Sequence, residues 1–237
     1  MAVASNLGGN SLTSVVAKYF AGTPARGGTS EAVTDALREA ILDGALPPST
    51  WLREDEIAEV LAVSRTPVRD AIRRLADEGL AVKTAHQGAV VASLSIEDVL
   101  ALYVVREDLE GVAARLAAVR CRPELLKNLN ATNTRMQRLA KRGDPQKLAQ
   151  LNLEFHRTLR LAAGNPYLDR FLAQVEQAVR RLPHTTFAEP GRTQQALAEH
   201  QAIIDAVTAQ DSAAAETAAK AHMRQARELR LSVLLGS

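Results

Sequence analysis

Residues 63–80 read VSRTPVRDAIRRLADEGL, and this stretch decides the fold of the N-terminal part of the chain. Ser64 is a favourable N-cap residue, and Pro67 falls in the first helical turn, where backbone N–H groups have no helical partner. Three apolar residues follow at helical spacing: Val68, Ile72 and Leu75. Gly79 then ends the pattern. The stretch predicts a helix over about 65–78 that buries one face.

The sequence on either side of this helix completes a winged helix-turn-helix. Helical periodicity also covers residues 30–43 and LREDEIAEVLAV, residues 52–63, and Gly44 separates the two segments. Beyond the helix, LAVKT (80–84) and GAVVA (88–92) are short and rich in valine, which predicts a β-hairpin. Three helices followed by a two-stranded wing are the order of elements in this kind of DNA-binding domain.

Helical periodicity alone continues from Ser95 to the C-terminus. SIED (95–98) resembles a capping box, and no strand candidate follows it. Six helices are expected, at roughly 96–120, 124–142, 145–163, 166–181, 193–209 and 211–234. The chain is therefore expected to be mainly α, with a flexible tail at 1–29, a winged helix-turn-helix domain at 30–93 and an all-α bundle at 94–237.

Composition agrees with a two-domain helical protein. The 237 residues are 46% hydrophobic and 24% charged, which is enough apolar material for two ordinary cores. The single cysteine, Cys121, forms no internal disulfide, which suits a reducing cytoplasm. No apolar run reaches the roughly 18 residues that span a bilayer. The N-terminal segment lacks the basic start and long apolar core of a signal peptide.

The charge of the first domain requires DNA binding to come from a segregated basic face. Residues 30–92 carry seven Lys or Arg and eleven Asp or Glu, a net charge of −4. Arg65 and Arg69 lie one turn apart at the start of the predicted helix, where an arginine can contact guanine in the major groove. Thr66 is placed to bind a phosphate. Two further arginines of this helix, Arg73 and Arg74, are interpreted differently. They are expected to lie on a solvated face and to pair with nearby carboxylates.

The first domain resembles the DNA-binding domain of the GntR family of bacterial repressors. The resemblance covers residues 30–92, and its specific pieces are SRTPVRDAIRRL and EGL…QGAVV. It implies that operator DNA is contacted by residues of the helix start and the wing tip: Arg65, Thr66, Arg69 and Gly88, with Gln87 beside the glycine. Some members also use an arginine at the start of the second helix. This chain has Asp55 at that position, and Arg53 is the expected substitute.

Three of the five histidines lie in different predicted helices of the bundle: His156, His200 and His222. Asn152 lies four residues before His156, so the two side chains share a helical face. Three imidazoles and an oxygen donor suit Zn²⁺, Ni²⁺ or a similar divalent ion. By spacing alone, however, a histidine on a helix is more often an ordinary core or surface residue. The other two histidines, His86 and His184, are not assigned to a metal.

The bundle resembles the C-terminal domain of the FadR-type branch of GntR regulators, the FCD domain. The segments that carry the resemblance are VVREDLEGVAARLAA, LNLEFHRTLRLAAGNPYL and ALAEHQAIIDAVTAQDSAAAETAAKAHM, within about residues 95–230. Many members bind a divalent metal through an Asp, a His four residues later and two further His. The matching positions are Asn152, His156, His200 and His222, and the neutral amide in the first position is a poorer ligand than a carboxylate.

Arg106 is the candidate contact for an effector. In the family an arginine at this position often faces the cavity and meets an effector carboxylate, which bidentate pairing explains. An ion pair with Glu110, four residues later, is an equally good interpretation.

Two functions of different classes fit these features. The preferred one is a homodimeric, cytoplasmic transcriptional repressor whose affinity for operator DNA is controlled by a small organic acid in the bundle, through a divalent metal. The alternative is a metal-dependent hydrolase-like domain tethered to a DNA-binding module. The chain has no H-E-x-x-H and no G-x-S-x-G motif, which favours the regulator. A DNA-binding architectural protein without a ligand would leave the three histidines unexplained.

Overall fold

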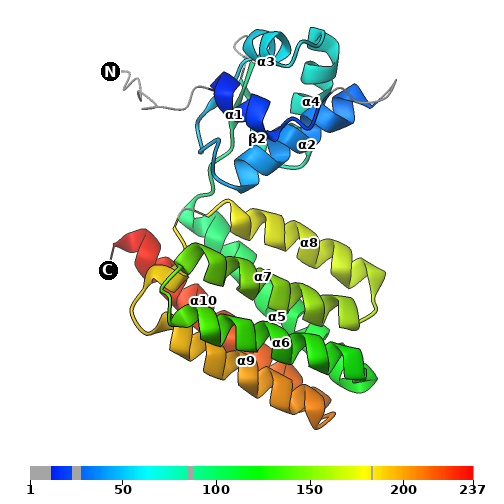
Figure 1. The fold of residues 1–237 in the computed structure, drawn as a ribbon, viewed down its shortest axis with the longest axis vertical. Helices are drawn as coiled ribbons and strands as arrows, with labels where there is room; N and C mark the ends of the chain where they lie inside the picture. The colour runs from blue at the N-terminus through cyan, green and yellow to red at the C-terminus, as the bar shows by residue number, and fades with distance from the viewer. Residues whose placement is uncertain (1–11, 23–27, 85–87, 183, 237) are drawn as a thin grey trace. The chain divides into compact units, whose positions relative to one another are not determined.

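A computed structural model describes residues 12–22, 28–84, 88–182 and 184–236, and they form a mainly helical protein (Figure 1). The chain divides into two compact units, Met1–Ser93 and Leu94–Ser237. The predicted fold class is confirmed: a winged helix-turn-helix precedes an all-α bundle. Within the described ranges no helix is both long enough and apolar enough to cross a membrane.

The first unit is built around the helix that the opening stretch predicts. Its helices are α1 (Leu12–Tyr19), α2 (Thr29–Leu42), α3 (Glu54–Val60) and α4 (Arg65–Asp77). Ser64 is the N-cap of α4 with extended backbone, as its place before the helix requires. One face of α4 is buried against the core of the unit: Val68, Ala71, Ile72 and Leu75. The opposite face, which carries the arginines, remains exposed.

The wing has one strand more than predicted. Strands β2 (Ala81–Thr84) and β3 (Gly88–Val91) form the expected antiparallel hairpin. A third strand, β1 (Trp51–Leu52), pairs antiparallel with the other edge of β3, with Leu52 opposite Ala89. Two residues cannot show an alternating pattern, so this strand has no local signal in the sequence. Leu52 is fully buried, and its side chain packs in the helical core and so connects the wing to it.

Part of the predicted flexible tail is a helix. Within residues 1–29, α1 buries Leu12, Val15 and Val16 in the core that α2 and α3 also line. The i, i+3, i+4 spacing of these side chains gives α1 an apolar face, and burying that face opposes the entropy cost of ordering the segment. The prediction of a tail is therefore wrong for residues 12–19. Residues 1–11 and 23–27 lie outside the described ranges.

The second unit contains the six predicted helices, at boundaries close to those expected. They are α5 (Ile96–Arg120), α6 (Pro123–Ala140), α7 (Pro145–Ala162), α8 (Pro166–Arg180), α9 (Arg192–Thr208) and α10 (Ser212–Leu235), with a short 3₁₀ helix η1 (Thr186–Ala188) before α9. The predicted capping box is present, because the Ser95 hydroxyl accepts from the Asp98 N–H and the Asp98 carboxylate accepts from the Ser95 N–H. Proline occupies the first position of α6, α7 and α8, where it costs no hydrogen bond.

The core of the bundle brings five helices together, with Leu125 and Leu129 as the contribution of α6. Small residues line the contact between α5 and α10, so these long helices pack closely: Ala114, Ala117, Ala118, Ala215 and Ala219. Phe155 and Leu159 of α7 and Ile203 of α9 complete this core and are fully buried. Figure 1 shows the helices of this unit running alongside one another. Polar side chains on the inner faces of α5, α7, α9 and α10 consequently meet inside the bundle.

Candidate functional site

The first candidate site is the exposed face at the start of α4. The side chains of Arg65 and Arg69 are 65% and 66% exposed, and Thr66 between them is also exposed. Each arginine is held through its Nε by a carboxylate of α3. Arg65 Nε lies 2.8 Å from Asp55 Oδ1, and Arg69 Nε lies 3.0 Å from Glu54 Oε2. The structure thus presents both predicted arginines outward from one helix face.

The other predicted DNA contacts fall around this face. Arg53 immediately precedes α3 and pairs through Nη1 with Glu56 at 2.8 Å. Gly88 begins β3 with φ +96°, a conformation that favours glycine at the wing tip. Gln87 lies outside the described residues. The carboxylate pairs expected for Arg73 and Arg74 do not form among the described residues.

The second candidate site is a buried cluster of the three bundle histidines. His156 comes from α7, His200 from α9 and His222 from α10, and none of them is more than 6% exposed. Each offers one ring nitrogen to a group in which these atoms lie within 4.8 Å of one another. The packing of α7, α9 and α10 therefore brings the three imidazoles together. From the sequence alone, they were known only to lie on separate helices.

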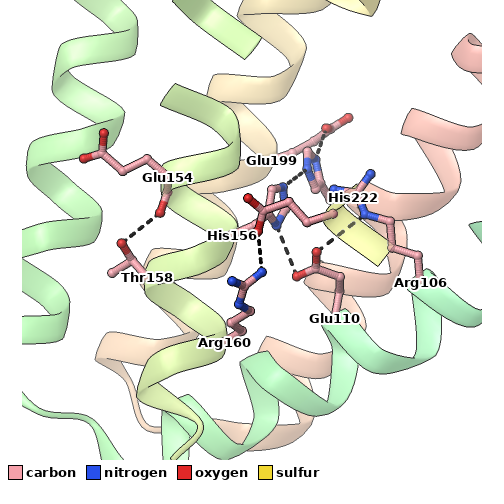
Figure 2. A network of polar contacts seen from close by, with 9 residues as sticks. Arg106, Glu110, Glu154, His156, Thr158, Arg160, Glu199 and His222 are labelled. Carbon is pink, nitrogen blue, oxygen red and sulfur yellow. Dashed lines mark hydrogen bonds and ion pairs between the residues drawn. The ribbon is translucent and has the colours of Figure 1, made fainter. Parts of the chain in front are cut away.

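Two glutamates fix the orientation of two of these imidazoles. Glu110 Oε2 lies 3.2 Å from His156 Nδ1, and Glu199 Oε2 lies 2.5 Å from His222 Nδ1 (Figure 2). A carboxylate accepts the proton of Nδ1 and leaves the Nε2 lone pair directed away from it. Those two Nε2 atoms face each other at 3.1 Å. Two lone pairs at this distance repel unless a proton or a cation lies between them.

The remaining polar atoms of the cluster distinguish between a proton and a cation. Both ring nitrogens of His200 are buried without a hydrogen-bond partner, although its ring stacks on Phe155 with centroids 3.9 Å apart. The Asn152 Oδ1 atom, one turn before His156, is also buried without a partner. A proton shared by His156 and His222 leaves the acceptor nitrogen of His200 unsatisfied, which is costly. A cation bound by one ring nitrogen of each histidine satisfies all three acceptors, so the three imidazoles fit a divalent metal.

The electrostatics of the cluster suit metal binding as well. Burial, the other two imidazoles and Arg192 hold the pKa of His200 well below its usual range. Burial, His156 and Arg192 do the same for the pKa of His222. Both rings are therefore neutral near pH 7, and only a neutral imidazole binds a metal. Burial by itself raises the pKa of Glu110, but His156 and Arg106 outweigh it and lower that pKa to about 2, so Glu110 remains an anion.

Two buried arginines complete the charge balance. Arg106 Nε lies 3.5 Å from Glu110 Oε1, and Arg192 Nη1 lies 2.9 Å from Glu199 Oε2. The ion-pair interpretation of Arg106 is thus correct in the structure. The same side chain also lines a pocket, together with Glu110, Leu153, His156, Arg160, Leu172, Val175 and Glu176. Figure 2 shows Arg106, Glu110 and Arg160 pointing toward His156 from α5 and α7.

Sequence reasoning gave Glu110 only as an ion-pair partner of Arg106 and assigned no role in this site to three other charged residues: Glu199, Arg160 and Arg192. Glu110 carried a signal, because it lies one turn after Arg106. Glu199 precedes His200 directly, yet its contact is with His222 on another helix. Arg160 binds Asp169 and Glu176, which only the packing of α8 against α7 brings near. These partners depend on tertiary contacts and have no sequence spacing that would reveal them.

A winged helix-turn-helix that exposes arginines, followed by a separate helical domain with a buried histidine cluster, is the architecture of a transcriptional regulator. The family comparisons agree with this class. The model of the gntR family of bacterial regulatory proteins matches residues 29–91, and the FCD domain model matches residues 101–225. The chain belongs to the GntR family of transcriptional regulators and carries an FCD domain.

Individual relatives are regulators too. The chain is 32% identical to a probable D-xylose utilization operon transcriptional repressor of Paenarthrobacter nicotinovorans, over 81% of this chain and 84% of that protein. It is 33% identical to the gluconate operon transcriptional repressor of Bacillus subtilis, over 59% and 57% of the two chains. Among solved structures, E. coli McbR/YncC has the same fold, with a TM-score of 0.71 over 87% of this chain and 98% of that chain at 20% identity.

Proposed function

We propose that this regulator binds operator DNA as a homodimer and that a small carboxylate, together with a divalent metal in the bundle, controls that binding. The observation that carries the proposal is the pair of Nε2 atoms held 3.1 Å apart by two glutamates, beside an imidazole with no partner. An arrangement of this kind is stable when a cation occupies it. That arrangement lies in the FCD domain and not in the winged helix-turn-helix domain.

His156, His200 and His222 would hold the metal, and Asn152 would add an amide oxygen. Zinc or nickel suits such a donor set. When bound, the metal supplies a Lewis-acidic centre that attracts an anion. Glu110 and Glu199 keep two of the imidazoles in the tautomer that binds it.

We assign the pocket beside the histidines to the carboxylate effector because basic side chains line it. Arg106 and Arg160 both line it, and His156 belongs to the pocket and to the metal cluster at once. Arginine binds a carboxylate through two parallel hydrogen bonds. Three aliphatic side chains on the remaining wall favour a small acid with an apolar part: Leu153, Leu172 and Val175.

The DNA-binding half of the proposal uses Arg65, Thr66 and Arg69 in the major groove. The wing tip at Gly88 and the side chain of Arg53 would contact the backbone, and Gln87 is assigned to the wing tip from the sequence. Operators are commonly palindromic and are bound by symmetric dimers. An acid that prefers one arrangement of the bundle shifts the spacing of the two recognition helices and weakens operator binding. Repression relieved by the acid follows from this linkage.

Metal analysis tests the histidine site directly. Protein purified without a nickel column is stripped with a chelator and titrated with Zn²⁺ and with Ni²⁺ in a calorimeter. We expect one site per chain, lost in His156→Ala and in His222→Ala and kept in His184→Asn, which changes a loop histidine outside the cluster. Failure of the stripped wild-type protein to bind either ion would contradict the proposal.

A second experiment tests the regulator against the hydrolase alternative. Double-stranded fragments of the source genome are selected on the protein, and the selected fragments are titrated with and without a panel of organic acids. Selection of a palindromic sequence, with affinity that one acid changes, supports the regulator. Binding that no acid alters, combined with turnover of an ester or amide substrate, would favour the alternative.

A further inference from the structure

The carboxylates at the start of α3 contact the two exposed arginines of α4 in a specific way. Asp55 and Glu54 bind Arg65 and Arg69 through the Nε atom of each guanidinium. Among the described residues, neither terminal NH₂ group of Arg65 or Arg69 forms a hydrogen bond with Asp55 or Glu54. An arginine that reads guanine uses those terminal groups for the O6 and N7 atoms. The carboxylates therefore occupy the side of the guanidinium that base recognition does not need.

From this geometry we infer that Asp55 and Glu54 are positioning residues that hold Arg65 and Arg69 for end-on recognition of guanine. An unrestrained arginine has many rotamers and can bind a phosphate as easily as a base. Fixing Nε removes part of that freedom before DNA arrives. The inference rests on the proposed function, in which these arginines contact operator DNA.

The same carboxylates act against binding that is independent of sequence. Non-specific affinity comes from attraction between basic side chains and phosphates. Asp55 and Glu54 carry negative charge beside the two arginines and repel phosphates that approach them. The surrounding domain adds to this effect, because residues 30–92 have a net charge of −4. Two effects therefore raise the ratio of specific to non-specific DNA affinity: a better-oriented base contact and a weaker phosphate contact.

The exposed position of these pairs gives them little value for stability. The Arg65 and Asp55 side chains are 65% and 66% exposed, and exposed ion pairs contribute little to folding. The Glu54 side chain is 27% exposed, and both carboxylates lie in the first turn of α3, so replacing either with its amide should change stability only by a small helix-dipole contribution. This separates a role in recognition from a structural role, because thermal unfolding reports only the latter.

The test compares Asp55→Asn and Glu54→Gln with Glu59→Gln, which makes the same charge change at an exposed position on the same helix. Wild-type protein first selects a duplex from a random-sequence pool. Fluorescence anisotropy then gives the affinity of each full-length variant for that duplex, for a scrambled duplex of equal composition and for duplexes with single guanine replacements.

We expect Asp55→Asn and Glu54→Gln to lower the ratio of selected to scrambled affinity by about tenfold, with part of the loss at one guanine position. Glu59→Gln should leave this ratio within about twofold of the wild type. In an Arg65→Lys background, Asp55→Asn should have no further effect on base preference, because lysine has no planar fork to orient. Melting temperatures should agree for all carboxylate variants.

The outcomes separate this inference from the proposal beneath it. If wild-type protein selects no sequence from the pool, operator recognition itself is wrong. If it selects a sequence and the two variants keep the discrimination of Glu59→Gln, operator recognition stands and the positioning role is refuted. A selected sequence without a guanine under α4 also refutes the positioning role.

Discussion

Replacing Glu199 with Gln is expected to weaken zinc binding without removing a ligand. Glu199 Oε2 lies 2.5 Å from His222 Nδ1 and 2.9 Å from Arg192 Nη1, so one carboxylate oxygen holds both side chains. A glutamine can accept from Nδ1 through its amide oxygen, but it carries no charge. Loss of an outer carboxylate of this kind typically lowers metal affinity roughly 10–100-fold, which corresponds to about 1.4–2.7 kcal/mol.

The structure places the expected effect in the upper part of that range. His222 is 2% exposed, Arg192 is 3% exposed and the Glu199 side chain is 16% exposed, so solvent screens the lost charge only in part. The variant also leaves the Arg192 guanidinium buried without its anionic partner, which destabilises the folded protein as well. Zinc affinity is measured by competition with a chromophoric chelator, and stability by urea unfolding of the stripped protein.

Glu228→Gln provides the matched control, because it removes an exposed carboxylate from the same helix as His222. Its zinc affinity should remain within about twofold of the wild type. The reasoning is refuted if Glu199→Gln binds zinc as tightly as this control. Conversely, a stability loss without any loss of zinc affinity would assign Glu199 to the Arg192 ion pair alone.

Three further predictions concern other parts of the chain. Val16→Ala should destabilise the N-terminal unit by about 1–2 kcal/mol in chemical unfolding, because Val16 is fully buried; an unchanged midpoint would show that α1 does not contribute. Ser95→Ala should cost about 0.5–2 kcal/mol at pH 7 through loss of the cap. The Ser95 hydrogen bonds lower the pKa of Asp98, so their contribution is present above the ordinary carboxyl pKa and is lost as pH falls through the lowered one; a penalty equal at pH 2 and pH 7 contradicts this. Arg106→Lys should weaken binding of the identified acid about tenfold while operator affinity without acid stays constant, and equal acid affinities would exclude a bidentate contact.

Local signals account for what the sequence predicts well. The N-cap Ser64, the early Pro67 and the apolar spacing of α4 all act within one helix, so α4 could be predicted without any tertiary information. The bundle helices begin at Pro145 and Pro166 for the same local reason. In contrast, α1 lies in a segment rich in Gly and Ser, a composition typical of a flexible tail. Its three apolar residues span only one turn, which is too short a pattern to predict a helix against that composition.

The candidate site shows the same division between local and tertiary information. Asn152 and His156 share a helix face, so their proximity follows from the 3.6-residue period. The contact of His222 with Glu199 joins α10 to α9, and that of His156 with Glu110 joins α7 to α5. No spacing along the chain encodes these contacts. The family resemblance could predict that the three histidines form one site. The carboxylates that orient two of them could be identified only from the packing of the helices.

The shared position of His156 links the proposed metal and effector sites. Its Nε2 belongs to the histidine cluster, while Nδ1 contacts Glu110, which in turn binds Arg106 at the wall of the pocket. A carboxylate that binds Arg106 competes with Glu110 for the guanidinium and so alters the charge that orients His156. By thermodynamic linkage, the factor by which the acid changes metal affinity must equal the factor by which the metal changes acid affinity. In the proposed function, the Arg106–Glu110–His156 chain would be the physical path that couples the metal site to the effector site.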